Sequence, residues 1–272
     1  VLYNEVLRFG EPTLPKVPLP FGGTPSARNP GAYTGAGYHG RFAPEFDRLI
    51  ISPAHYALVV YSALIEVGRM DEGALDHFNR DGGSMEMIGA EHSPGMEVTT
   101  GSLGQGLSVA AGIAWARMRK GDSGRVWVFM SDGEFQEGQV WECLAAMSHH
   151  RIDNVRVVVD VNRQQCDGSM SEVLDLGDLP RRAAAFGAVT YSVDGHDLSA
   201  LRAVALHENV PGKPQIIFAN TSAYHGMSYL RARSPRLHYV RFKSRAEREE
   251  AKSAIATELG VPVSELREPE HG

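Results

Sequence analysis

The sequence predicts an α/β fold: a doubly wound parallel sheet with helices on both faces. The first observation is a set of short apolar stretches rich in β-branched residues, each of strand length. The second is that helical patterns separate these stretches, as crossovers between parallel strands require. The expected strands are 125–130, 155–161, 188–193 and 215–219.

Helices are expected before, between and after these strands. Ser52-Pro53 is a favourable helix start, because proline suits the first helical position, and an apolar helix is expected over 55–67. The segment 103–118 is helical and rich in small residues, which permit close packing against a neighbour. Residues 80–101 are expected to be a glycine-rich loop. Further helices are expected at 71–79, 139–150, 198–208 and 244–259.

Residues 1–44 are expected to form an irregular arm ahead of one large domain at 45–272. The density of proline and glycine in the arm excludes long helices and central strands. The segment is either an extended arm or lid, wrapped on a partner, or a flexible leader.

Composition excludes several classes of protein. The net charge of −6 argues against a dedicated nucleic-acid binder. No apolar run reaches the roughly 18 residues needed to span a membrane, and residues 1–10 lack the pattern of a signal peptide. Two cysteines, Cys143 and Cys166, are too few for a disulfide framework or a metal cluster. We therefore expect a cytoplasmic protein in which both thiols are buried and inert.

Polar residues follow two successive strands of the predicted sheet. Asp132 and Gly133 follow the first strand, and Asn162 follows the second. Because ligands bind at the carboxyl ends of parallel strands, these residues are expected at one edge. Carboxylate and amide oxygens suit Mg²⁺ or Ca²⁺, and glycine lets the backbone approach a phosphate. The pattern predicts a metal–diphosphate site; the alternative is that Asp132 merely caps the turn that follows it.

The same stretch resembles the thiamine diphosphate signature of the transketolase family. Residues 131–142 read SDGEFQEGQVWE, where the family has GDGExQEGxxWE. Residues 160–168 read DVNRQQCDG, where the family has DxNxxQxDG, and residues 94–106 read PGMEVTTGSLGQG, close to PGVEVTTGxLGQG. The resemblance covers about residues 45–240. A Rossmann dehydrogenase fits poorly, because no G-x-G-x-x-G fingerprint follows a strand.

The resemblance implies thiamine diphosphate and Mg²⁺ as cofactors. The side chains of Asp132 and Asn162 and the backbone carbonyl of Gln164 would bind Mg²⁺. Gly133 would meet the diphosphate, and Glu134 belongs to the same cofactor-binding stretch.

The resemblance also places residues around the rings of the cofactor. Gly101, Leu103 and Gly104 would cradle the aminopyrimidine and the thiazolium. His55 matches the histidine that faces cofactor and substrate, and His238 matches one near the diphosphate. The plainer alternatives are a histidine packed on a helix for His55 and an unrelated position in an irregular segment for His238.

Other candidate residues concern the substrate and the assembly. Glu137 would lie at a subunit interface and couple paired active sites. The family's sugar-binding histidine falls on Met87 or Ile88 without gaps, so His92 would have to replace it from a shifted position. Arg80 stands one residue from the family's sugar-phosphate arginine. Because cofactor residues are kept while sugar-recognition residues are altered, we expect a non-standard donor or acceptor, such as a carrier-protein thioester, in a specialised biosynthetic pathway.

A full transketolase carries a further, pyrimidine-binding domain that supplies the catalytic glutamate, normally from the opposing subunit. This chain resembles only the diphosphate-binding domain. It is therefore expected to be the N-terminal subunit of a split transketolase-like enzyme, an α₂β₂ heterotetramer acting on a small ketose or 2-oxo donor. A fragment of a longer protein, a two-component 2-oxo acid decarboxylase or dehydrogenase, and a non-catalytic scaffold subunit are the alternatives.

Overall fold

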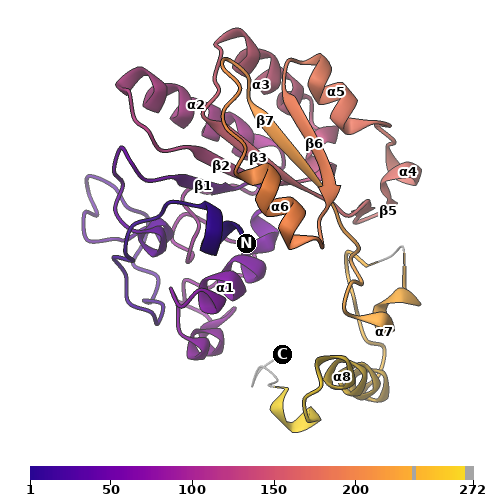
Figure 1. Cartoon of the computed structure of the whole chain (residues 1–272). Coiled ribbons are helices and arrows are strands. Elements are labelled where there is room, and N and C mark those ends of the chain that lie inside the picture. The colour runs from indigo at the N-terminus through magenta and orange to yellow at the C-terminus, as the bar shows by residue number, and fades with distance from the viewer. Residues whose placement is uncertain (235–236, 267–272) are drawn as a thin grey trace. The chain divides into compact units, whose positions relative to one another are not determined.

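The computed structural model describes residues 1–234 and 237–266, and divides the chain into two compact units (Figure 1). The first unit comprises residues 1–161 and 178–220, and the second comprises 162–177 and 221–272. Among the described residues, no helix combines the length and the apolar character that a membrane crossing needs.

The first unit contains a five-stranded sheet in the order β1-β2-β3-β7-β6, and every neighbouring pair is parallel. This confirms the predicted fold class. The edge strand β1 was not expected, because four residues, RLII, are too few to show a pattern. The strands are β1 (Arg48–Ile51), β2 (Val126–Ser131), β3 (Val155–Val161), β6 (Val189–Asp194) and β7 (Gln215–Asn220).

The strand order explains which helices cover which face. From β1 through β2 and β3 to β6 the chain advances in one direction across the sheet, so right-handed crossovers place the helix that leads into each next strand on one face. From β6 to β7 it turns back, so α6 (Leu198–Ala205) covers the opposite face, as Figure 1 shows. The helices of the first face are α2 (Gln105–Lys120), α3 (Gly138–His149) and α5 (Leu179–Ala185).

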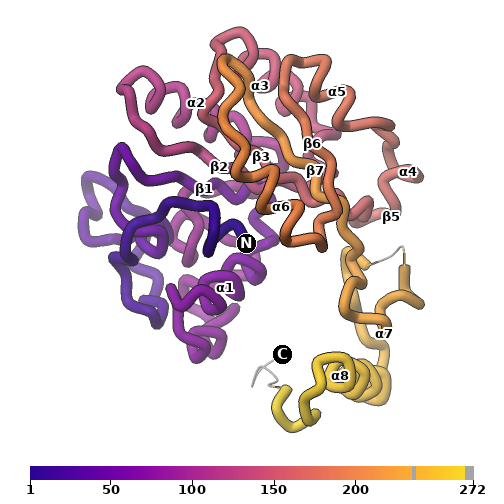
Figure 2. Tube along the Cα trace, viewed as in Figure 1, coloured from indigo at the N-terminus to yellow at the C-terminus, as the bar shows by residue number. Residues whose placement is uncertain are grey.

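A hydrophobic cluster on the α6 side joins the sheet to α1 (Ala57–Glu66) and to the arm. Trp127 and Ile217 of the sheet belong to it, and so do Leu7 and Tyr38 of residues 1–44. Figure 2 traces the arm, in indigo, beside β1 and α1. As expected, residues 1–44 contain only short turns and one bridge: η1 (Leu2–Val6), η2 (Gly35–His39) and Ser26–Asn29.

The ends of several helices differ from the sequence expectation. The helix expected over 55–67 opens with a 3₁₀ turn, η3 (Ala54–Tyr56), before α1 begins at Ala57. The helix expected at 71–79 is a shorter 3₁₀ segment, η4 (Glu72–His77). Helix α2 begins two residues later than expected, because Gly104 adopts a left-handed conformation with φ of 79°. Residues 80–101 form neither helix nor strand, as predicted.

The second unit consists of short elements and one long helix. The predicted C-terminal helix is α8 (Arg245–Leu259), which Ser244 caps by accepting the Glu247 N–H at 3.2 Å. The other elements of the second unit are β4 (Gln164–Gln165), β5 (Gly168–Ser169), α4 (Met170–Val173), α7 (Ser228–Arg231) and η6 (Val263–Glu265). Strands β4 and β5 form a two-residue antiparallel hairpin.

Candidate functional site

The carboxyl ends of β2 and β3 lie side by side, as the sequence predicted. Ser131 of β2 pairs with Asp160 of β3 in the sheet register. Asp132 follows β2 directly, is 1% exposed and opens the 3₁₀ turn η5 (Asp132–Gln136). The Asp160 carboxylate accepts a hydrogen bond from the Tyr56 hydroxyl at 2.7 Å. The sheet edge therefore presents carboxylates on two adjacent strands.

The Glu134 side chain is completely buried at this edge and is held by groups of the protein itself. Its carboxylate accepts hydrogen bonds from the Gly104 N–H at 2.8 Å and the Ser131 N–H at 2.9 Å. The Ser52 hydroxyl also donates to it. Burial raises the pKa of Glu134, and the hydrogen bonds oppose this rise only in part.

The roles of Ser52 and Ser131 were missed in the sequence. Residues 131–134 read S-x-x-E, the signature of a capping box, and both reciprocal hydrogen bonds of that box are present. That local signal could have identified Ser131. No local signal predicts the contact of Ser52 with Glu134, because the two residues lie 82 positions apart.

The two glycines Gly101 and Gly104 of the loop before α2 have different surroundings. A Cβ on Gly101 would have no heavy atom within 4 Å, so the space over this residue is open. A Cβ on Gly104 would lie 3.0 Å from Cβ of Glu137. Leu103 is fixed through its carbonyl, which accepts from the Gln139 side chain at 3.1 Å. Gly104 is thus buried against the start of α3, and the bare backbone that a flat cofactor needs for close approach lies at Gly101. Gly101 fits the group in this respect.

His55 is exposed on η3, on the same unit as the glycine loop. The Gly89 N–H donates to the Ala54 carbonyl at 3.0 Å, which places the 87–89 segment beside the turn that carries His55. Met87 and Ile88, the positions of the family's sugar-binding histidine, are 55% and 53% exposed. The positions at which the family binds a sugar therefore carry exposed apolar side chains in this chain.

His92 contacts residues of its own loop and of the arm. Its Nε2 lies 3.0 Å from the Glu86 carboxylate, and its ring packs against Phe21 of the arm at 4.4 Å between centroids. Arg80 is exposed. The Phe21 N–H also donates to the Gly82 carbonyl at 2.9 Å. The arm therefore packs, around Phe21, along the loop that carries both candidate sugar-recognition residues, Arg80 and His92.

Three predicted residues lie in the second unit. The Asn162 side-chain oxygen accepts the Gln164 N–H at 2.8 Å, in a turn where Arg163 has a φ of 60°. The Leu237 N–H donates to the Gln164 side chain at 3.4 Å, so the unit brings Gln164 close to the segment that carries His238. His238 itself is exposed.

The described residues contain no group of three or more histidine, cysteine, aspartate or glutamate side chains that could hold a metal ion. The ligand set expected from the sequence contains a single carboxylate, an amide and a carbonyl, which is a different kind of site. Such oxygen donors suit Mg²⁺, which keeps open positions for phosphate oxygens.

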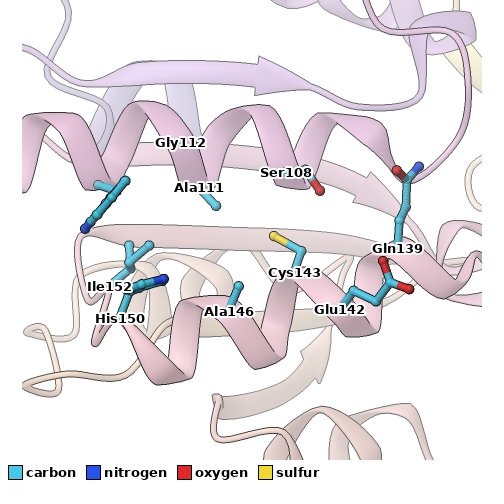
Figure 3. Close-up of a pocket in the computed structure, with 10 residues that line it drawn as sticks. Ser108, Ala111, Gly112, Gln139, Glu142, Cys143, Ala146, His150 and Ile152 are labelled. Atoms are coloured by element: carbon cyan, nitrogen blue, oxygen red, sulfur yellow. The ribbon is translucent and has the colours of Figure 1, made fainter.

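Glu137 is exposed and lies directly before α3, where its side chain makes no capping hydrogen bond. A hollow of about 410 Å³ runs between α2 and α3 (Figure 3). None of the candidate site residues lines it. Cys143 points into this space, and burial raises the pKa of its thiol, which agrees with an inert role. Cys166 is exposed, so the expectation that both thiols are buried was wrong for it.

Comparison with known proteins gives a consistent family. Residues 42–233 match the family described as "Transketolase, thiamine diphosphate binding domain". An uncharacterized transketolase family protein of Sinorhizobium fredii is 38% identical over 200 residues, covering 72% of this chain and 71% of that protein. The 6-deoxy-6-sulfo-D-fructose transketolase subunit SqwG of Clostridium sp. is 35% identical over 188 residues, covering 68% of each chain.

A solved structure supports the fold. Transketolase from Campylobacter jejuni superposes with a TM-score of 0.67 at 22% identity, over 81% of this chain and 35% of that chain. This chain thus spans about a third of the solved enzyme and about 70% of the two relatives above. With the sheet edge, the glycine loop and the matched residues in agreement, the chain belongs to the transketolase family and carries its thiamine diphosphate-binding domain.

Proposed function

We propose that this chain is the N-terminal subunit of a thiamine diphosphate- and Mg²⁺-dependent transketolase-like enzyme, which transfers a two-carbon ketol unit. The observation that carries the proposal is the open backbone at Gly101, in a loop whose Gly104 N–H is held by Glu134 at the strand end that bears Asp132. Thiamine diphosphate, when bound, supplies the electron sink needed to cleave a carbon–carbon bond beside a carbonyl group.

The family signature assigns the roles of the chain's own residues. Asp132 and Asn162 would hold Mg²⁺ through their side chains, and Gln164 through its carbonyl, while Gly133 admits the diphosphate to the backbone. Leu103 would face the cofactor rings from the glycine loop.

The histidines have separate roles under this proposal. His55, exposed beside the 87–89 segment, would face the donor substrate and bind or move a proton at a substrate oxygen. His238 would contact the diphosphate. His92 would act only at the margin of the substrate pocket, because its ring already contacts Phe21 and Glu86.

We further propose a partner subunit. The relative SqwG is itself named a subunit, and the present chain covers 35% of the solved transketolase chain. A C-terminal chain would supply the pyrimidine-binding domain and the catalytic glutamate, in an α₂β₂ heterotetramer with Glu137 at the interface between subunits.

A non-standard substrate fits the altered recognition residues. Met87 and Ile88 place apolar side chains where the family binds sugar hydroxyls, and SqwG is named for a sulfonated sugar. The donor or acceptor of this enzyme would then differ from the common pentose phosphates, and a carrier-protein thioester is one such acceptor.

The test is calorimetric titration of thiamine diphosphate, with Mg²⁺, into this chain together with its candidate partner. Saturable binding is expected for the native chain and at least about tenfold weaker binding for Asp132→Ala, since a ligand to the metal is lost. Asp178→Ala, which removes an exposed carboxylate capping α5, is the control for the loss of one charge.

A substrate screen on the same complex separates the remaining interpretations. Comparable turnover of xylulose 5-phosphate and ribose 5-phosphate would contradict a non-standard substrate. Decarboxylation of pyruvate would indicate a 2-oxo acid enzyme. Failure of a verified complex to bind the cofactor would indicate a non-catalytic scaffold.

A further inference from the structure

One buried carboxylate joins three separate segments at the edge of the sheet. Glu134 is 0% exposed and follows β2. Its Oε1 accepts the Gly104 N–H, from the glycine loop, and the Ser52 hydroxyl, from the turn after β1. Its Oε2 accepts the Ser131 N–H. Both oxygens are thus engaged, each with a different part of the first unit.

The Ser52 contact is itself constrained by close packing. Ser52 is completely buried, and a Cβ on Gly106 would lie 2.5 Å from its Oγ. The serine is therefore held between the first turn of α2 and Glu134. Three residues later in the chain comes His55.

The groups that hold Glu134 are hydroxyls and backbone N–H groups, which carry no charge. Burying a carboxylate without a cation is unfavourable. A contribution to the stability of the fold therefore does not explain why a glutamate occupies position 134. What the carboxylate provides is geometry: two acceptor oxygens, at a fixed separation, that can satisfy donors from three segments at once.

We infer that Glu134 is a positioning residue that sets the Gly101–Gly104 loop and the turn before His55 against the end of β2. The inference rests on the proposed function, in which that loop cradles the cofactor. Glu134 acts through Gly104 and Ser52, so the role expected for it inside the cofactor-binding stretch is exerted through the loop.

The test compares two isosteric substitutions of buried acids. Glu134→Gln replaces one acceptor oxygen with an NH₂ group, so either the Gly104 or the Ser131 N–H loses its acceptor. Asp47→Asn is the matched control. Asp47 is 4% exposed and accepts the Arg125 N–H at 2.8 Å and the Arg8 N–H at 3.0 Å, ahead of β1 at the opposite edge of the sheet.

Two measurements are made on the complex with the partner chain: thiamine diphosphate affinity, and hydrogen–deuterium exchange of the Gly104 amide without cofactor. Glu134→Gln is expected to weaken binding about tenfold, the effect of one lost hydrogen bond to a charged group. It is also expected to speed Gly104 exchange at least about fivefold. Asp47→Asn is expected to leave both within about twofold of the native protein while lowering thermal stability.

The positioning role is overturned if Glu134→Gln matches the native protein in Gly104 exchange, or if Asp47→Asn changes Gly104 exchange equally. If the native complex fails to bind the cofactor, the proposed function fails, but the exchange comparison still decides whether Glu134 holds the loop. Should Glu134→Gln not fold, Ser52→Ala removes one donor only. It is expected to produce a smaller change in the same direction, and no change would contradict the inference.

Discussion

Glu97 shows how a single residue secures the arm in the core of the first unit. Its buried carboxylate accepts hydrogen bonds from the His39 ring at 2.9 Å and the Leu49 N–H at 2.8 Å, and it pairs with Arg48. The other ring nitrogen of His39 bonds the Tyr3 hydroxyl at 2.9 Å. Burial alone would raise the pKa of Glu97, but His39 and Arg48 outweigh it and lower that pKa.

Glu97→Gln is expected to lower the free energy of unfolding by about 3 kcal/mol near neutral pH, because it leaves Arg48 without its anion. Since the folded-state pKa is lowered, the contribution of Glu97 is present above the pKa of an unfolded glutamate. It is lost as the pH falls through the folded-state pKa. Urea unfolding of both proteins between about pH 7 and pH 2.5 should therefore show a difference that is constant down to about pH 4.5 and narrows below that pH. A difference that stays constant with pH would contradict this account.

At the scale of elements, α2 shows that two glycines in one helix can have opposite effects on stability. A Cβ on Gly106 would lie 2.5 Å from Oγ and 2.8 Å from Cα of Ser52, so the helix can approach β1 only with glycine there. A Cβ on Gly112 would meet no heavy atom within 4 Å. The first glycine is required by packing, whereas the second only weakens the helix.

Gly106→Ala is expected to lower the free energy of unfolding by about 1–3 kcal/mol, as overpacking does. Gly112→Ala should raise it by about 0.5–1 kcal/mol, because alanine is the better helix former. Chemical denaturation of the two variants and the native chain measures both. Equal effects of the two substitutions would show that helix propensity, rather than contact with Ser52, decides the result.

At the scale of the whole chain, the first nine residues join parts of the first unit that are far apart in sequence. The Phe9 ring stacks on His39 at 4.2 Å, Glu5 pairs with Arg202 of α6 at 2.6 Å, and Leu7 enters the hydrophobic cluster. The first part of the arm is therefore packed into this unit.

Phe9→Ala is expected to destabilise the first unit by about 2 kcal/mol through lost burial and aromatic contact, and to make the arm sensitive to trypsin at Arg8 and Arg28. Phe21→Ala is the matched control, since Phe21 also contacts a histidine but is 46% exposed. It should change stability by less than about 1 kcal/mol. Limited proteolysis followed by mass spectrometry distinguishes the two, and equally rapid cleavage of the arm in the native chain and in both variants would argue against a packed arm.

Local patterns were sufficient for most elements of the sheet layer. The stretch VRVVVDV predicts β3 over its full extent, and the limits of β2, β6, β7, α3 and α8 agree within one residue. These segments combine strong periodicity with turn residues at their ends, so nearby residues decide their structure. The missed strand β1 has only four residues, and its position depends on pairing with β2.

The sequence by itself determined the α/β class, the family, and the strand ends where Asp132 and Asn162 stand, because each of these depends on residues close together in the chain. Only the tertiary structure decided how the candidate site is held. Glu134 meets Gly104 and Ser52, which lie 30 and 82 residues away, and His92 meets Phe21 of the arm. Such contacts form when segments that are distant in the sequence pack together, so the hydrophobic periodicity along the chain does not predict them.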